Sequence, residues 1–202
     1  MRNASRIFGC AVLAAASLSC GDVVRQGRSS VYLTLDSLTA SPGGGSATAS
    51  NFLLSDVERL VRTPLPCSDA TPCPTVFNDT GNATFRLVPK DVGLAPTSNN
   101  EVTLTRYHVT FRRADGRNTP GVDVPYAFDG AVTGLVGVGG GGISFELVKH
   151  VAKQESPLVQ LITSRTVITT LAEVTFYGKD RVGNDISVTG TIQVDFGNFA
   201  DA

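Results

Sequence analysis

Apolar and polar residues alternate along much of the chain after residue 30, which is the pattern of β-strands with one buried face. The alternation is clearest near the C-terminus, where every second residue from Ile186 to Phe196 is apolar or glycine and the residues between them are polar or charged. Such a strand is typical of an antiparallel sheet that is covered on one side only. We expect it to form a hairpin with residues 167–177, which are rich in Val, Ile, Thr and aromatic side chains.

The same period of two predicts further strands, separated by residues that favour turns. They span 31–35, 82–88, 102–111, 131–136 and 143–151. In the strand at 102–111 the apolar face changes sides near Thr105 and Arg106, so we expect a β-bulge there.

Two segments carry helical signals. Residues 51–62 fit one face of a helix and also fit a strand, and both interpretations stay open at this point. Ser156 as a cap and Pro157 as the first helical residue favour one or two helical turns over 158–162.

The connection between the last two strands contains Asp180, Gly183 and Asn184. Glycine supplies the positive φ that tight turns need, and Asp or Asn side chains accept hydrogen bonds from nearby backbone amides. At these residues the chain resembles the final hairpin of bacterial immunoglobulin-like domains. The resemblance and the many short strands predict an all-β fold: an antiparallel immunoglobulin-like β-sandwich with one short helix, in a single domain over 31–202.

The N-terminal segment has a different pattern. Arg2 and Arg6 precede an apolar run that ends in Ser17, Leu18 and Ser19, followed by Cys20. A basic head, a short apolar run and small residues at its end are typical of a secretory signal peptide, and the run is too short for a membrane-spanning helix. We therefore predict that residues 1–19 are a signal peptide and that the mature protein is exported.

The residues before Cys20 resemble the lipobox of bacterial lipoproteins, in which a leucine and two small residues precede a cysteine that is acylated. That family places the leucine three residues before the cysteine, whereas this chain has Ser17 there and Leu18 one place later. The resemblance implies that Cys20 carries lipid, and Gly21 after it implies sorting to the outer membrane. Ordinary signal-peptidase cleavage, which would give a periplasmic or secreted protein, remains the alternative.

Residues 20–30 are then expected to be a lipid-anchored tether. Residues 21–30 are mostly polar and would reach about 33 Å when fully extended. The domain would therefore stay close to its membrane.

Charge narrows the choice of partners. Loss of Arg2 and Arg6 with the signal leaves 15 basic and 18 acidic residues, a formal charge of −3. This weak acidity, without a basic stripe, argues against a nucleic-acid partner.

Cys67 and Cys73 lie close together in a proline-rich loop, while Cys10 leaves with the signal. In an exported protein this spacing predicts a structural disulfide between Cys67 and Cys73. No further thiol or imidazole is near enough in the sequence to complete a metal site, so we predict none. A stapled, proline-rich loop also offers a rigid contact surface.

Other residues with catalytic chemistry do not form a recognisable motif. His108 and His150 both fall inside strand patterns, and the chain has no Gly-x-Ser-x-Gly sequence. The glycines over 137–142 precede a strand rather than a helix, so we expect a flexible hairpin loop and no phosphate site.

The acidic residues are also scattered. Asp56 with Glu58, or Asp123 with Asp129, would have to be fixed at a defined separation to act as a glycosidase pair, and the sequence does not fix one. The turn between the last two strands contains Asp180, Asn184 and Asp185. Turn chemistry is the favoured interpretation of these residues, although a calcium ion held by their side-chain oxygens is an alternative.

These observations predict a membrane-anchored envelope lipoprotein with a non-catalytic binding, adhesion or structural role and no cofactor. Two alternatives stay open. One is an exported hydrolase whose site is assembled from distant loops, and the other is a subunit of a larger envelope complex.

Overall fold

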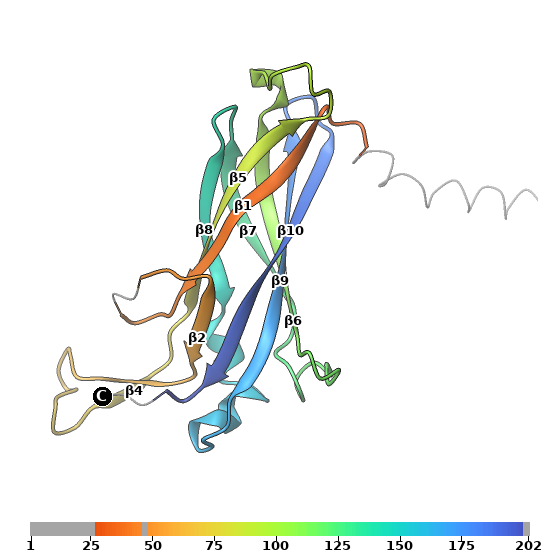
Figure 1. Ribbon diagram of the computed structural model, residues 1–202. Helices are drawn as coiled ribbons and strands as arrows, with labels where there is room; N and C mark the ends of the chain where they lie inside the picture. Colours follow the sequence, from red (N-terminus) through yellow and green to blue (C-terminus); the bar gives the residue numbers. More distant parts are fainter. Residues whose placement is uncertain (1–26, 46–47, 200–202) are drawn as a thin grey trace, which may run out of the picture.

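Two β-sheets packed face to face form a β-sandwich (Figure 1). The structure is a computed structural model that describes residues 27–45 and 48–199. Within these residues, no helix is both long enough and apolar enough to cross a membrane.

The smaller sheet has three strands in the order β1-β5-β8, and its neighbouring strands are antiparallel. The strands are β1 (Val31–Ser41), β5 (Asp79–Pro89) and β8 (Gly141–Val148).

The larger sheet has five strands in the order β2-β10-β9-β6-β7. Its strands are β2 (Phe52–Asp56), β6 (Val102–Arg112), β7 (Phe128–Val136), β9 (Ile168–Asp180) and β10 (Asp185–Gly197). The pair of β2 and β10 is parallel, and the other pairs in this sheet are antiparallel.

The remaining elements are short. β3 (Arg59–Val61) and β4 (Cys73–Thr75) form a separate two-stranded ribbon. The helical pieces are η1 (Ser98–Asn100), α3 (His150–Lys153) and η2 (Leu158–Ile162).

The all-β prediction is confirmed, and so is the bulge, since the pairing of β6 with both β7 and β9 shifts between Leu104 and Arg106. The segment 51–62, which fitted helix and strand equally well, forms strands β2 and β3. The short helical piece at 158–162 is a 3₁₀-helix whose N-cap is Pro157, not Ser156.

The strand predicted over 143–151 is wrong at its end, because β8 stops at Val148 and α3 begins at His150. The backbone N–H of His150 donates to Asn78 Oδ1 at 2.6 Å, which satisfies one of the free amides at the start of the helix. The helical turn also directs Lys153 into the interior, where it is 1% exposed.

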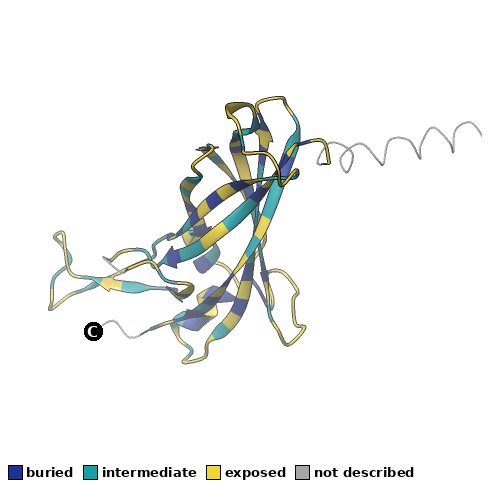
Figure 2. Ribbon diagram, turned by 45° about the horizontal axis from the view of Figure 1, so that its top comes forward, coloured by how far each residue is buried: buried dark blue, intermediate teal, exposed yellow. Residues whose placement is uncertain are grey.

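The core lies between the two sheets, and the strands show the expected stripes of buried and exposed residues (Figure 2). Its centre is aromatic: Phe85 and Phe145 come from the smaller sheet, and Tyr107 and Phe176 come from the larger one. Phe176 contacts Phe85 and Phe145 edge to face, with ring centroids 5.0 and 5.2 Å apart. Few aromatic residues are therefore enough to fill the centre of the core, because they meet at one place between the sheets.

A buried polar cluster closes one side of the core. The carboxylate of Asp79 and the ammonium of Lys153 are each 1% exposed and lie 2.9 Å apart. Ser55 Oγ donates to Asp79 Oδ2 at 2.6 Å, and Gly43 N–H donates to Asp79 Oδ1 at 2.9 Å. Lys153 Nζ also donates to the carbonyl of Asp56 at 2.9 Å, so the charges are compensated by hydrogen bonds from several elements.

The sandwich has two ends, which we call the entry end and the far end. At the entry end the described chain begins, and the connection 90–101 and the turns 137–140 and 181–184 lie beside it (Figure 1). The far end carries the β3–β4 ribbon, the loop 113–127, α3 and η2 (Figure 1).

The residues just before β1 contact the domain. Ser29 is buried, Asn100 Nδ2 donates to Ser30 Oγ at 2.6 Å, and Lys90 Nζ donates to the carbonyl of Gly27 at 3.0 Å. Residues 27–30, which the sequence analysis places in the tether, are thus packed against the sandwich.

The Lys153→Met variant should lower the free energy of unfolding by about 3–5 kcal/mol, because it leaves Asp79 buried without its counter-charge. The matched control is Lys179→Met, which removes an ion pair of similar length, 2.8 Å, from a lysine side chain that is 57% exposed. This control should cost less than about 1 kcal/mol. Urea unfolding of both variants measures the difference, and equal losses would contradict a special role for the buried pair.

Candidate functional site

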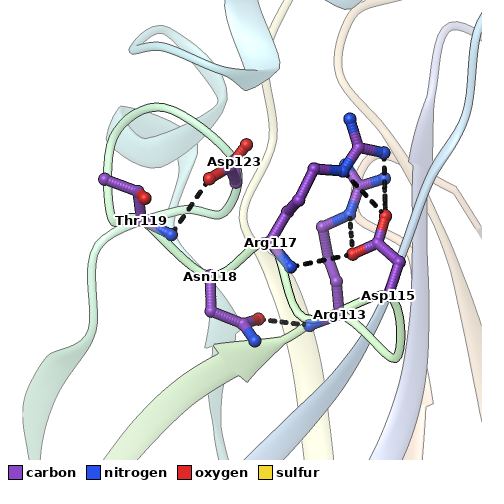
Figure 3. A network of polar contacts seen from close by, with 6 residues as sticks. All are labelled: Arg113, Asp115, Arg117, Asn118, Thr119 and Asp123. Carbon is purple, nitrogen blue, oxygen red and sulfur yellow. Dashed lines mark hydrogen bonds and ion pairs between the residues drawn. The ribbon is translucent and has the colours of Figure 1, made fainter.

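The loop 113–127 at the far end is ordered by side-chain contacts rather than by regular structure (Figure 3). Asp115 Oδ2 accepts hydrogen bonds from Arg113 Nη2 and Arg117 Nη2, each at 2.8 Å. Asn118 Oδ1 accepts from the backbone N–H of Arg113 at 2.7 Å. The first half of the loop is thus closed onto itself.

The two guanidinium groups also set the charge state of this loop. Hydrogen bonds from the side chains of Arg113 and then Arg117 lower the pKa of Asp115 far below its ordinary value of 3.8. Asp115 in turn raises the pKa of Arg117. The carboxylate therefore stays ionised at neutral pH and keeps holding both arginines.

The second half of the loop presents apolar side chains to solvent. Thr119 N–H donates to Asp123 Oδ2 at 3.1 Å (Figure 3). Val122 and Tyr126 are 66% and 57% exposed. Gly121 has φ +75°, and a Cβ there would lie 2.3 Å from Tyr126 Oη, so only glycine allows the tyrosine to lie against this turn. An ordered loop with an exposed tyrosine and valine is typical of a protein contact surface.

The ribbon of β3 and β4 is a second ordered projection at the far end. It stands away from the sandwich in both views (Figures 1 and 2). Cys67 and Cys73 form a disulfide, as the sequence predicts, and it closes the loop 67–73; Leu65, two residues before this loop, is 86% exposed. Ser68 and Thr71 exchange backbone hydrogen bonds inside this loop.

Toward the far end, the outer face of the larger sheet carries three exposed apolar side chains among polar ones. Gln193 of β10 pairs with Phe52 of β2 on one side and with Leu171 of β9 on the other. Phe52, Leu54 and Leu171 are each between 45% and 48% exposed. This row continues the apolar surface of the far end onto the sheet.

Nearer the entry end the same outer face is polar and slightly hollowed. The guanidinium of Arg106 lies 3.7 Å from the centre of the Tyr177 ring, beside an open hollow of about 340 Å³. The bulge in β6 brings Arg106 to this outer face. Leu104 points inward, and in a regular strand Arg106, two residues later, would point inward as well.

His108 lies on this outer face between two polar side chains. Its Nδ1 is 3.2 Å from Asp129 Oδ1, and its Nε2 is 3.1 Å from Thr110 Oγ1. Arg106 Nη1 also contacts Asp129, at 3.4 Å. The side chain of His108 is 36% exposed, and the residues that line the hollow do not include it.

The other residues that the sequence singled out have separate partners. His150 belongs to α3 rather than to a strand, and its Nδ1 is 2.8 Å from Asn78 Oδ1. Asp56 accepts a hydrogen bond from the backbone of Phe199. Gly137 and Gly140 form a tight two-way bridge, after which Gly141 begins β8.

The turn that offered a calcium site uses its oxygens internally. Asp180 Oδ1 accepts from the backbone N–H groups of Val182 and Asn184, at 3.1 and 2.8 Å, and its Oδ2 accepts from Asn184 Nδ2 at 2.9 Å. Burial raises the pKa of Asp180, but these hydrogen bonds and one from Ser29 outweigh it, so the pKa lies below its ordinary value. Asp185 pairs with Lys179 at 2.8 Å.

No group of three or more His, Cys, Asp or Glu side chains suited to a metal ion occurs in the described part of the chain. Cys20 lies outside the described residues.

The network that orders the loop 113–127 was not predicted from the sequence. The signal was present in Arg113-Ala114-Asp115-Gly116-Arg117, where an acid lies two residues from an arginine on either side.

Comparison with known proteins gave no match, whether to a protein-family model, to a curated protein or to a solved structure. The site is therefore argued from its geometry.

Asp115→Asn should speed amide hydrogen exchange in residues 113–118 while leaving the unfolding midpoint of the sandwich unchanged, because the network is on the surface. In the native protein the lowered pKa means that the ion pairs persist above pH 3.8 and are lost only as the pH falls further, through the folded pKa. Hydrogen exchange with mass spectrometry measures both effects, with the amides paired between strands β9 and β10 as the internal control. Unchanged exchange in the variant would show that Asp115 does not order the loop.

Proposed function

We propose that this chain is a bacterial envelope lipoprotein, anchored through acylated Cys20, whose sandwich binds a protein partner at its far end without catalysing a reaction. The observation that carries the proposal is the difference between the two ends of the molecule. The chain enters the sandwich at one end, and the two ordered projections stand at the other (Figure 1). These projections carry the exposed side chains of Leu65, Val122 and Tyr126.

The dimensions suit this arrangement. β10 has 13 residues, so the sandwich is about 44 Å long in the strand direction. An anchor at the entry end would hold the far end well clear of the lipid headgroups, where a protein of the envelope can reach it.

The chemistry of the far end favours a protein over a small molecule. The exposed apolar side chains lie on ordered loops and on a sheet face rather than inside a pocket, and Tyr126 and Phe52 supply the aromatic contacts that protein interfaces use. Because the loops are already ordered, binding would cost little additional conformational entropy.

We further propose that the sandwich is immunoglobulin-like. Domains of that kind pack a sheet containing strands A, B and E against a sheet containing G, F, C and C′. The orders β1-β5-β8 and β10-β9-β6-β7 support this assignment, since they follow the same sequence of strands.

Membership of a larger envelope complex is a form of the same proposal. β2 and β7 are the outer strands of the larger sheet, and the apolar row at Phe52, Leu54 and Leu171 lies beside β2. A subunit that covers this edge would use the same far-end surface.

A hydrolase is the second candidate, because Thr110, His108 and Asp129 form a hydrogen-bonded line. Two features weigh against it. The line lies on the face of a sheet, where the backbone N–H groups that would stabilise an oxyanion are used in strand pairing, and Arg106 shares Asp129. Reaction of the native protein, but not of Thr110→Ala, with a fluorophosphonate probe would favour the hydrolase.

The anchor is tested by intact mass of the full chain purified from detergent-solubilised bacterial membranes, beside Cys20→Ala. We expect a species that begins at Cys20 and carries a diacylglyceryl group and an acyl chain, and we expect it in the outer-membrane fraction. The variant should lack both additions. An unmodified native chain in the periplasm or the medium would refute the anchor.

Partner binding is tested by placing a photo-reactive benzoylphenylalanine at Tyr126 in cells that export the full chain. The matched control is the same replacement at Tyr32, which is near the entry end and 58% exposed, against 57% for Tyr126. We expect a discrete cross-linked protein from position 126 that is lost when Val122→Asp is added, and none from position 32. Equal cross-linking from both positions, or none from 126, would contradict the proposal.

A further inference from the structure

The entry end also carries exposed apolar side chains, at the tips of three loops. Val92 is 99% exposed, Leu94 65%, Val182 74% and Val138 47%. Val92 and Leu94 follow β5, Val138 lies between β7 and β8, and Val182 lies between β9 and β10. None of these positions belongs to the far-end surface.

The loop tips are held in place by hydrogen bonds at their bases. Asp91 Oδ1 accepts from Gly93 N–H at 2.9 Å, and the carbonyl of Asp91 accepts from Leu94 N–H at 3.1 Å. The turn at Val182 is held by Asp180, as described above. The backbone N–H of Arg181 donates to the carbonyl of Glu101 at 3.1 Å, which joins this turn to the connection 90–101.

The chain itself places a membrane beside these tips. Six residues separate Cys20 from Gly27, the first described residue, and the seven Cα–Cα steps between them span at most about 25 Å when fully extended. That reach is shorter than the sandwich, so the end that bears Gly27 is the end nearest to the anchor.

Most of the charged side chains around the tips are paired or basic, and Asp91, beside Val92, is an exposed acid among them. Arg181 pairs with Glu101, and Lys179 pairs with Asp185. Lys90 lies 5.1 Å from the centre of the Tyr32 ring, and Arg28 is exposed beside the entry. Basic side chains near apolar tips suit the boundary between lipid phosphates and acyl chains.

We propose that the tips at Val92, Leu94, Val138 and Val182 insert into the surface of the bilayer that carries the anchor, and so hold the sandwich upright on it. This inference rests on the proposed acylation of Cys20. It assigns the two ends different surfaces: the entry end contacts lipid, and the far end contacts protein.

The chain contains no tryptophan, so one introduced tryptophan reports a single position. The test uses the full, lipidated chain reconstituted into vesicles of phosphatidylethanolamine and phosphatidylglycerol. The variants are Val92→Trp and Val182→Trp. The matched control is Val122→Trp at the far end, where the native valine is 66% exposed against 74% for Val182. Fluorescence is quenched either by brominated acyl chains or by iodide in the water.

We expect positions 92 and 182 to show blue-shifted emission, quenching by brominated lipid and protection from iodide. Position 122 should show the opposite pattern. A chain that is acylated by intact mass and floats with the vesicles, but whose positions 92 and 182 are as open to iodide as position 122, overturns this inference alone. A chain that carries no lipid and does not float overturns the proposed anchor and this inference with it.

Discussion

The buried ion pair between Asp79 and Lys153 is the constraint on which the far half of the sandwich depends. It joins the first residue of β5 to α3, and Ser55 and Gly43 bring β2 and the loop after β1 to the same carboxylate. A buried carboxylate without these donors would be costly, so the four segments must arrive together or the cluster cannot form. The pair thereby fixes the position at which β2 pairs with β10. It also fixes the point from which the β3–β4 ribbon projects.

Loops that lack regular structure acquire order here by a common device. An aspartate at the base of each loop accepts hydrogen bonds from backbone amides or arginines nearby: Asp91 and Asp180 at the entry end, and Asp115 at the far end. These loops also carry exposed apolar side chains. Both ends of the molecule therefore present hydrophobic side chains on ordered loops. The ends differ in that the chain enters the sandwich at only one of them.

Local patterns made the sheet predictable. The alternation over 186–196 and the change of face near Thr105 follow from side-chain direction along a strand, which is a property of neighbouring residues. The end of β8 was not predictable in this way, because His150 leaves the strand through a contact with Asn78 and Lys153 turns inward to meet Asp79. These partners are more than seventy residues away in the sequence. The apolar row at the far end was hidden for the same reason, since Phe52 and Leu171 come to lie on either side of Gln193 only through strand pairing.

The hydrogen bonds that hold residues 27–30 against the sandwich have a mechanical consequence. In the proposed arrangement, a partner held at the far end and an anchor beyond Gly27 would pull in opposite directions, roughly along the strands. Tension entering at β1 is passed to β5 through ten paired positions of the antiparallel ladder. Loaded in this direction, the hydrogen bonds slide past one another in shear and share the force, instead of opening one after another as they would if the strands were peeled apart. With the proposed anchor and partner in place, the sandwich would transmit tension along its strands between a membrane and the protein that it binds.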